Sequence, residues 1–458
     1  MSPRRRDARR NRERIVEAAT RLLAQSPAAS LTDIAAAAGV SRSTLHRHFP
    51  HREALQAALE AQPKQMPAAG EGPLPPGRLG REGPVPLDPI QVLDAVAPPL
   101  LPEQLVAEAQ RLAGVPLALY VIDIDGTNLL RIAGPARLPP RLKAPLAVGP
   151  ELDADGLAEL RERLRKYRGV EVVPMWLRGR ALGVLLTLGL PRRDITELAR
   201  QAAAAIVLAD RYTDAFARAQ RRKQPKAAAE MQQAMLPPRI LGVTGGEVAG
   251  NVLPSYEVAG DWFDVAENPD GVWLTLANGL GGGTRATAAS AVALGALRAS
   301  RRSDGTITEA LMVMHRTLKE MPGPGAEMSA VVAHWDAATF ELRVANCGHV
   351  APIIIRSDGE AERIRTPNRH GLGGRASPRP HERSASLGSG ERLLLVSDGV
   401  VKEGRGKAGL GPEGVIEAAL RSQRANAPDT VRHVHTAVLE ASGGELADDA
   451  TVVCLAVR

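Results

Sequence analysis

The sequence predicts a multidomain chain in which a small all-α unit is followed by an α+β unit and then by a layered αβ sandwich. Three observations support this prediction. The chain has 458 residues, too many for one ordinary domain of about 150 residues. Residues 62–89 are rich in proline and glycine, which favours a linker over a helix. Apolar residues recur at helical spacing before this segment, whereas helical and strand-like patterns alternate after it.

The predicted domain boundaries follow these changes. The all-α domain covers residues 1–61, and the linker covers residues 62–89. The α+β domain covers residues 90–194. A connecting helix over residues 195–238 then leads to the sandwich domain at residues 239–458.

The connecting helix has two open interpretations. One stripe at helical spacing is formed by Ile206, Ala209, Thr213 and Phe216. The stripe fits either pairing with a second copy of the chain or packing on the helix's own domain. Pro225 must end or kink the helix, because proline has no backbone N–H to donate. The sequence therefore leaves a homodimer open.

Positive charge is concentrated at the N-terminus. The chain has a formal net charge of +7, and residues 1–14 contribute +5, from seven Arg against Asp7 and Glu13. Such an arm can contact the phosphates of a nucleic acid. The alternative is a general preference for Arg, since only 8 of the 58 basic residues are Lys.

Cysteine content and hydropathy predict a cytoplasmic protein. Cys347 and Cys454 are too few for a disulfide framework or a thiolate metal site, and we expect them to be small core residues. No apolar run approaches the ~18 residues that a membrane-spanning helix needs. The Arg-rich start leads into an amphipathic pattern and not into the apolar segment of a signal peptide.

The all-α unit has the pattern of a helix-turn-helix. A first amphipathic helix is followed by a short helix over Thr32–Ala38, which Gly39 can end in a left-handed conformation. Ser41 can cap a third helix over Arg42–His48. Two short helices joined by a glycine-containing turn form this motif, and its second helix enters the major groove of DNA.

The segment Leu31–Leu55 resembles the DNA-binding domain of TetR-type regulators. The resemblance implies that the third helix touches DNA and that Arg52 lies near the DNA backbone. The implied helix contacts are Arg42, Ser43, Thr44, His46 and Arg47. His46 stands where the family usually has Tyr. The alternative is a helical unit that serves only for dimerisation.

The middle of the chain resembles a GAF-type sensory domain in the order of its elements. Pro102–Gly114 has a helical pattern, and Leu117–Asp123 has a strand pattern. Val170–Pro174 and Arg180–Thr187 form a strand pair around a turn. The resemblance implies an α+β GAF-like domain that senses a ligand, but no residue identifies that ligand.

The C-terminal half alternates strands with two helices, which predicts an αβ sandwich. The helical patterns are Ala286–Leu297 and Ile307–Leu318. The strand patterns are Val272–Ala277, Met328–Trp335, Phe340–Ala345, Ala351–Ile355, Leu393–Val396 and Thr451–Val457.

Acidic residues follow or precede several of these strands. They are Asp261, Asp264, Asp398, Asp448 and Asp449. Alone, each would be an ordinary turn residue at the end of a strand. Together, beside glycines that allow a ligand to approach the backbone, they predict one site. Hard ions such as Mg²⁺ and Mn²⁺ prefer the carboxylate oxygens that such a site offers.

Five motifs in order resemble the SpoIIE/RsbU branch of PPM-type protein phosphatases. They are Val258–Asp264, Trp273–Gly283, Ala345–His349, Ser397–Gly399 and Asp448–Thr451, with a similar lead-in at Met231–Pro238. The resemblance covers about half of the chain. It implies an αβ-sandwich PPM phosphatase-like domain, a metal-dependent serine/threonine phosphatase. The implied substrate is a phosphorylated regulatory protein of the anti-anti-sigma type.

The resemblance also implies a role for each residue of the site. Two divalent ions, Mn²⁺ or Mg²⁺, would activate a shared water and neutralise the phosphoryl group. Asp261 would hold the second ion, and Asp398 and Asp448 the first. The bridging position falls on Asn278, with the carbonyl of Gly279 beside it. Asp264 and Asp449 would orient waters or face solvent, and His349 is expected to be a hydrogen-bonded structural histidine.

Asn278 is the main departure from the family pattern, which has a bridging Asp there. An amide oxygen can coordinate a hard ion but adds no negative charge. Even changes in the outer shell of a metal site reduce affinity or activity ~10–100-fold. Two hypotheses therefore stand: a DNA-linked phosphatase, or a DNA-binding regulator with a degenerate, non-catalytic phosphatase-like domain.

Overall fold

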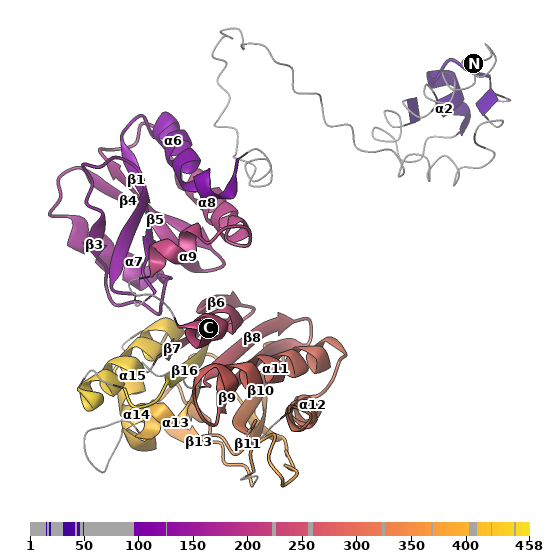
Figure 1. Cartoon of the computed structure of the whole chain (residues 1–458). Helices are drawn as coiled ribbons and strands as arrows, with labels where there is room; N and C mark the ends of the chain where they lie inside the picture. Colours follow the sequence, from indigo (N-terminus) through magenta and orange to yellow (C-terminus); the bar gives the residue numbers. More distant parts are fainter. Residues whose placement is uncertain are drawn as a thin grey trace. The chain divides into compact units, whose positions relative to one another are not determined.

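The computed structural model divides the chain into two compact units, Met1–Glu82 and Gly83–Arg458 (Figure 1). It describes residues 15, 18–19, 31–41, 44–45, 49, 96–124, 126–221, 226–254, 260–322, 326–367, 370–402, 410–422, 424–443 and 446–458. No helix of these residues is both long enough and apolar enough to cross a membrane.

The first unit is helical around a small apolar core. Helix α2 spans Leu31–Ala37. Gly39 has φ 61°, which confirms the left-handed residue after the helix. The Ser41 hydroxyl accepts a hydrogen bond from the Thr44 backbone at 3.2 Å and confirms the predicted cap. The buried core side chains of this unit are Ile15, Ala18, Ala19, Ile34, Ala35, Ala38, Leu45 and Phe49.

The second unit begins with an α+β domain built on one antiparallel sheet, in the order β3-β2-β1-β5-β4. The strands are β1 (Leu117–Ile122), β2 (Asn128–Ala133), β3 (Arg141–Lys143), β4 (Val170–Leu177) and β5 (Arg180–Leu188). The helical segments are η1 (Pro98–Leu100), α6 (Leu101–Ala113), α7 (Ala154–Leu164), α8 (Thr196–Ala209) and α9 (Ala215–Gln220).

Both faces of this sheet are covered by helices. On β1, Leu117 and Leu119 share a core with α6 and α8. Ala118 and Tyr120, which alternate with them, share a second core with α7. The α+β prediction is therefore confirmed.

The predicted connecting helix is interrupted earlier than Pro225, the position at which the sequence predicts an end or a kink. The chain forms α8, then α9, and then α10 (Ala227–Met235). Ile206 and Phe216 are both buried in the core of the α+β domain itself. The stripe therefore packs on its own domain, and the chain turns after Ala209 to bring Phe216 back onto that core.

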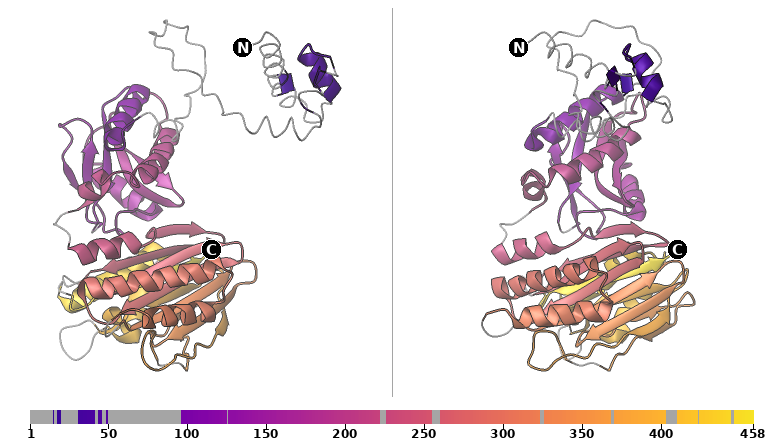
Figure 2. Two further views of the ribbon diagram at one scale, coloured as in Figure 1. Left: turned by 45° about the vertical axis from the view of Figure 1, so that its right-hand side comes forward. Right: turned by 90° about the vertical axis from the view of Figure 1, so that its right-hand side faces the viewer.

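The sandwich consists of two stacked antiparallel sheets, in the orders β14-β11-β10-β9-β8 and β13-β12-β15-β16-β7-β6 (Figure 2). Its strands are β6 (Ile240–Val243), β7 (Gly246–Leu253), β8 (Trp262–Asn268), β9 (Gly271–Gly279), β10 (Met328–Asp336), β11 (Glu341–Cys347), β12 (Ile353–Ile355), β13 (Ala361–Arg363), β14 (Arg383–Ser386), β15 (Arg392–Val396) and β16 (Ala450–Val457).

Helices cover the outer face of each sheet, so the domain has four layers. Helices α11 (Gly283–Arg302) and α12 (Ile307–Lys319) cover the first sheet. Helices α14 (Gly411–Leu420) and α15 (Ala427–Ser442) cover the second, and the short α13 (Asp398–Lys402) follows β15. This arrangement confirms the predicted αβ sandwich.

Strand β16 illustrates how the layers are held together. Val453 and Leu455 point into the core between the sheets, which also contains Phe263 and Trp335. Cys454, which lies between them in sequence, points into the core beneath the outer helices. Cys454 and Cys347 are both fully buried, which confirms that they are core residues.

The buried carboxylate of Asp264 connects β8 to α11 by two ion pairs. One carboxylate oxygen lies 2.7 Å from Nη2 of Arg298, and the other lies 2.8 Å from Nη1 of Arg301. The Asp264 side chain is 2% exposed. Asp264 therefore neither faces solvent nor points to the predicted site, in contrast to the expectation from the sequence, because two arginines of α11 hold its carboxylate.

Asp264→Asn should lower the free energy of unfolding by about 3–5 kcal/mol, because it leaves two arginines without their buried counter-charge. Urea denaturation followed by circular dichroism measures this change. Asp358→Asn is the matched control, since Asp358 lies on an exposed turn. Equal stability of the two variants would contradict this assignment.

His435 of α15 should make the fold sensitive to acid. Burial lowers the pKa of its imidazole from 6.5 to about 3. Below pH 6.5 the unfolded chain binds a proton that the folded chain does not bind until about pH 3. The free energy of unfolding should therefore fall by about 1.4 kcal/mol per pH unit across this window on account of His435.

Urea unfolding between pH 7.5 and pH 4.5 tests this expectation. His435→Gln should reduce the dependence of stability on pH. His433→Gln on the same helix should not, because the His433 side chain is 38% exposed. An identical pH dependence in all three proteins would rule out the role of His435.

Candidate functional site

The predicted acids lie where strands of the two sheets end. Asp261 directly precedes β8, and Asn278 and Gly279 are the last two residues of β9. Asp398 is the first residue of α13, and one residue separates it from the end of β15. Asp448 lies two residues before β16. The fold therefore brings residues from distant parts of the sequence to one end of the sandwich.

The carboxylate of Asp261 is buried, and its two oxygens differ in their hydrogen bonding. Its Oδ2 accepts a hydrogen bond of 2.6 Å from the Thr451 hydroxyl. Its Oδ1 is buried and has no hydrogen-bond partner among the described residues. Burial, and then the nearby charge of Asp449, raise the pKa of Asp261 well above its usual value. A buried oxygen of this kind is one that a cation or a donor could satisfy.

Asp398 is held by donors at both oxygens. Oδ1 accepts a hydrogen bond from the side-chain amide of Asn278. Oδ2 lies 2.5 Å from Nζ of Lys402, one helical turn further along the chain. Burial raises the pKa of Asp398, but the hydrogen bond and charge of Lys402 outweigh this effect and bring it below its usual value. Asp398 is therefore an ionised carboxylate neutralised by a side chain of the same domain.

The orientation of the Asn278 amide follows from chemistry. The reversed orientation would place its carbonyl oxygen against an oxygen of Asp398. In the observed orientation, the side-chain amide nitrogen of Asn278 donates a hydrogen bond to Asp398. A carboxylate at position 278 would have an oxygen in place of this nitrogen. Asn278 is 7% exposed, so this contact is largely shielded from water.

Gln232 connects α10 to the acids of the site. Its Nε2 lies 2.8 Å from Oδ2 of Asp449 and 2.8 Å from the backbone oxygen of Asp261. Gln232 is 1% exposed. Asp448 accepts a hydrogen bond of 2.8 Å at Oδ1 from the Asp449 backbone. Asp449 is therefore a buried hydrogen-bond partner of α10 and does not face solvent.

The side chains do not fit a site for two divalent ions in this arrangement. Among the described residues, no three or more His, Cys, Asp or Glu side chains are grouped so that they could hold a metal ion. Both oxygens of Asp398 are engaged, and Lys402 places a positive charge where an ion would bind. The buried Oδ1 of Asp261, which has no hydrogen-bond partner among the described residues, does suit a cation.

His349 lies beside this cluster. Its Nδ1 is 2.7 Å from the hydroxyl of Ser329, which pairs with Asn278 across β10 and β9. Burial lowers the pKa of His349 to about 4, although the charge of Asp398 opposes this shift. His349 is thus the hydrogen-bonded histidine expected from the sequence, and it is neutral at physiological pH.

Lys402 and Gln232 are the two site residues that the sequence did not identify. Lys402 follows Asp398 at a spacing of four, the spacing at which ion pairs form on a helix. Gln232 lies inside the lead-in segment Met231–Pro238, but its spacing from the acids carries no signal. The spacing of Lys402 was therefore a usable signal, whereas Gln232 needed the structure.

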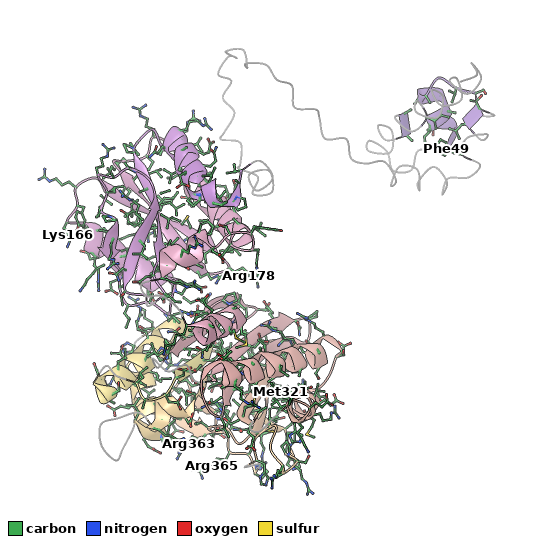
Figure 3. The ribbon with its side chains drawn as sticks, viewed as in Figure 1. Phe49, Lys166, Arg178, Met321, Arg363 and Arg365 are labelled. Atoms are coloured by element: carbon green, nitrogen blue, oxygen red, sulfur yellow. The ribbon has the colours of Figure 1, made fainter. Side chains whose placement is uncertain are left out.

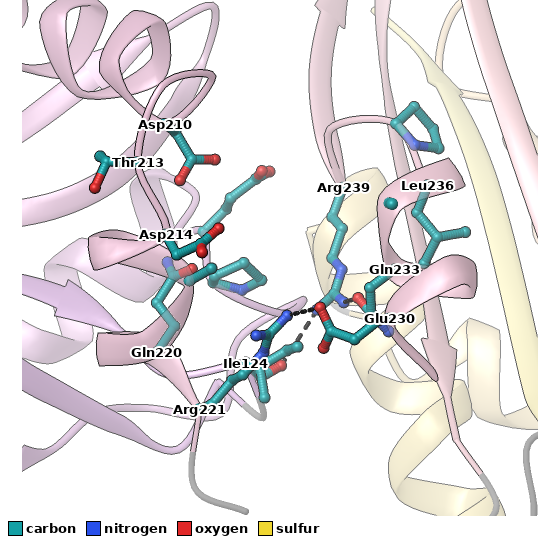
Figure 4. A pocket seen from close by; sticks show the side chains of 15 residues that line it. Ile124, Asp210, Thr213, Asp214, Gln220, Arg221, Glu230, Gln233, Leu236 and Arg239 are labelled. Carbon is teal, nitrogen blue, oxygen red and sulfur yellow. Dashed lines mark hydrogen bonds and ion pairs between the residues drawn. The ribbon is translucent and has the colours of Figure 1, made fainter. Parts of the chain in front are cut away.

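Helix α10 also contacts the α+β domain, around a cavity of about 350 Å³ (Figure 4). Arg221, at the end of α9, forms an ion pair with Glu230 of α10. Arg239 donates to Oε1 of Gln233 at 2.7 Å and to the backbone oxygen of Ile124 at 3.2 Å. The helix that reaches the acids is therefore also bound to the preceding domain.

Two further contacts join the α+β domain to the sandwich. Arg178, which is labelled in Figure 3, lies at the turn between β4 and β5. Its Nη2 lies 3.1 Å from Oε2 of Glu267 on β8. Glu151 accepts a hydrogen bond of 2.8 Å from the Ile240 backbone and forms a buried ion pair with Arg180. These contacts fix the start of β6 against the α+β domain.

Most of the predicted DNA-contacting residues fall outside the described part of the chain. Thr44 is described, and its hydroxyl lies 2.8 Å from that of Ser41. The others, Arg42, Ser43, His46, Arg47 and Arg52, lie outside the described residues. Their roles remain predictions.

Two family models match separate parts of the chain. Residues 268–458 match the family of stage II sporulation protein E (SpoIIE). Residues 15–59 match the bacterial regulatory proteins of the tetR family.

The transcriptional repressor LfrR of Mycolicibacterium smegmatis is 56% identical over 50 residues, which are 11% of this chain and 26% of that repressor. The chain thus spans about a quarter of this relative.

Solved structures resemble about half of the chain. The RsbU and RsbW domains of Rv1364c from Mycobacterium tuberculosis are 23% identical, with a TM-score of 0.43, and the match covers 47% of this chain and 60% of that one. The SiaA-PP2C domain of Pseudomonas aeruginosa is 19% identical, with a TM-score of 0.44, and the match covers 50% of this chain and 94% of that one. From the two family matches, the chain carries a tetR-family domain near its N-terminus and a SpoIIE-family domain of the PPM phosphatase type at its C-terminus.

Proposed function

We propose that the protein is a cytoplasmic DNA-binding regulator whose PPM-type domain recognises a phosphorylated regulatory protein without turning it over efficiently. The observation that carries this proposal is the state of Asp398. Its two oxygens are held by Asn278 and Lys402, so its charge is balanced within the domain. A PPM-type hydrolase would use that carboxylate to hold a divalent ion.

The partner we propose is a protein bearing phosphoserine or phosphothreonine, of the anti-anti-sigma type. RsbU- and SpoIIE-like relatives act on such proteins, and the fold of the domain supports the same class of partner here. The first unit would bind DNA through Arg42, Ser43, Thr44, His46, Arg47 and Arg52. One such unit covers only ~600–1,000 Å² of surface, so useful specificity requires a homodimer on paired half-sites.

The α+β domain is proposed to be a GAF-like sensor. Its central antiparallel sheet with helices on both faces and the cavity of about 350 Å³ beside α9 and α10 support this role. A ligand that moved α9 relative to α10 would act on the ion pair between Arg221 and Glu230. The signal would then reach the acids through Gln232.

The second candidate is a metal-dependent serine/threonine phosphatase with two Mn²⁺ or Mg²⁺ ions. The orphaned, buried oxygen of Asp261 favours it, because a cation would satisfy that oxygen. In that case Asp261, Asp398 and Asp448 would hold the ions, with Asn278 and the Gly279 carbonyl at the bridging position. When bound, the ions would supply an activated water and neutralise the phosphoryl group.

We expect the natural chain to bind a serine-phosphorylated anti-anti-sigma-type protein but to hydrolyse it, with Mn²⁺ present, no faster than Asp398→Ala does. The reason is that Asn278 supplies no negative charge to a metal. Phosphate release measures turnover, and calorimetric titration measures binding, with the unphosphorylated protein as control. Turnover that Asp398→Ala abolishes would establish the second candidate and contradict the first.

DNA binding should be sequence-specific and sensitive to salt. Arg47→Ala should weaken binding to the selected site and reduce the slope of log Kd against log salt by about 1 if Arg47 contacts a phosphate. Random-site selection with the full chain, followed by fluorescence anisotropy at several salt concentrations, measures both. Arg168→Ala, an exposed Arg of the α+β domain, is the matched control. If no sequence is enriched, the regulatory role is wrong.

A further inference from the structure

Lys402 is placed so that it competes with any metal ion at Asp398. It is the last residue of α13, four residues after Asp398, and its Nζ lies 2.5 Å from Oδ2 of that residue. The Asp398 side chain is 30% exposed and that of Lys402 is 74% exposed. The ammonium therefore reaches the carboxylate from the solvent side, which is also the side open to a dissolved ion.

Both oxygens of Asp398 are engaged, by chemically different donors. Oδ1 accepts from the neutral amide of Asn278, and Oδ2 pairs with the charged Lys402. A divalent ion at Asp398 must displace the ammonium or lie beside it. Displacing the ammonium breaks its ion pair with Asp398, and binding beside the ammonium brings two positive charges together.

We propose that Lys402 replaces a divalent ion as the counter-charge of Asp398, so that the site stays metal-free for two independent reasons. One is the missing carboxylate at Asn278, and the other is the ammonium of Lys402. This inference rests on the proposed function and deepens it. An acid at position 278 would therefore be insufficient to create a metal site, because Lys402 would still be paired with Asp398.

Asp261 is the part of the site that Lys402 leaves open. Its Oδ1 is buried and has no hydrogen-bond partner among the described residues, and its Oδ2 is bound to Thr451. Once position 278 carries a carboxylate and Lys402 is removed, Asp261 and Asp398 would both be available beside it. Three carboxylates are a donor set that suits Mn²⁺.

The test is Mn²⁺ binding by isothermal titration calorimetry on the full chain, in six proteins. They are the natural chain, N278D, K402Q, N278D/K402Q, N278D/K402R and N278D/K319Q. We expect N278D/K402Q to bind Mn²⁺ at least ~10-fold more tightly than N278D, the size of effect typical of groups around a metal site. The natural chain and K402Q should show no saturable binding at the site.

Two variants test whether the effect of Lys402 on Mn²⁺ binding depends on its positive charge and on its position. N278D/K402R keeps the positive charge and should bind Mn²⁺ as weakly as N278D. N278D/K319Q removes an exposed Lys of α12 and should also behave like N278D. Equal affinities of N278D and N278D/K402Q would overturn the inference, and so would saturable binding by the natural chain as tight as that of N278D/K402Q.

Thermal unfolding followed by circular dichroism gives a second readout if clustered carboxylates weaken the fold. Mn²⁺ should raise the Tm of N278D/K402Q more than that of N278D, because an ion that binds only the folded state stabilises it. Equal increases would count against the inference. The proposed function has a separate test, since it fails if the natural chain turns over phosphoprotein, whatever the ranking of Mn²⁺ affinities among the variants.

Discussion

The location of the site depends on the burial of both faces of both sheets. On β9 and β16 successive side chains point alternately into the core between the sheets and into the core beneath the helices. Neither core can accept an isolated charge without a large cost in desolvation free energy. Acidic residues are therefore confined to strand ends or, like Asp264, need two arginines of their own. Because two sheets end at the same place, Asp261 and Asp398 are brought together although they are far apart in the sequence.

Charge balance then decides what this cluster can do. In a metal-dependent hydrolase, divalent ions compensate several ionised carboxylates. Here Asp398 is compensated by Lys402, while burial and the charge of Asp449 raise the pKa of Asp261 and favour its neutral form. His349 is also neutral, because burial lowers its pKa to about 4. The ionised carboxylate of Asp398 is therefore balanced by Lys402 within the domain.

Periodicity was sufficient to predict the sandwich, because strands such as Met328–Asp336 and Ala450–Val457 are long apolar runs between turn residues. It failed at the connecting helix, where Ile206 and Phe216 share a helical stripe in sequence but face one core from two separate helices. Linear spacing cannot distinguish these cases, since the turn between α8 and α9 is set by packing. The acids were predictable because motifs fix them at strand ends. The role of Gln232 was not predictable, because the two residues that it contacts lie 29 and 217 positions away in the sequence.

The contacts of α10 connect the cluster of acids to the α+β domain. Gln232 donates to Asp449 and to the backbone of Asp261, whereas its neighbours Glu230 and Gln233 are bound to Arg221 and Arg239. A shift of α10 that breaks the outer contacts would also break the buried hydrogen bond from Gln232 to Asp449. Loss of a buried hydrogen bond costs more free energy than an exposed ion pair gains, so the two ends of α10 should move together. In the regulator that we propose, a change in the α+β domain would thereby alter the surface that a phosphorylated partner meets, with or without hydrolysis.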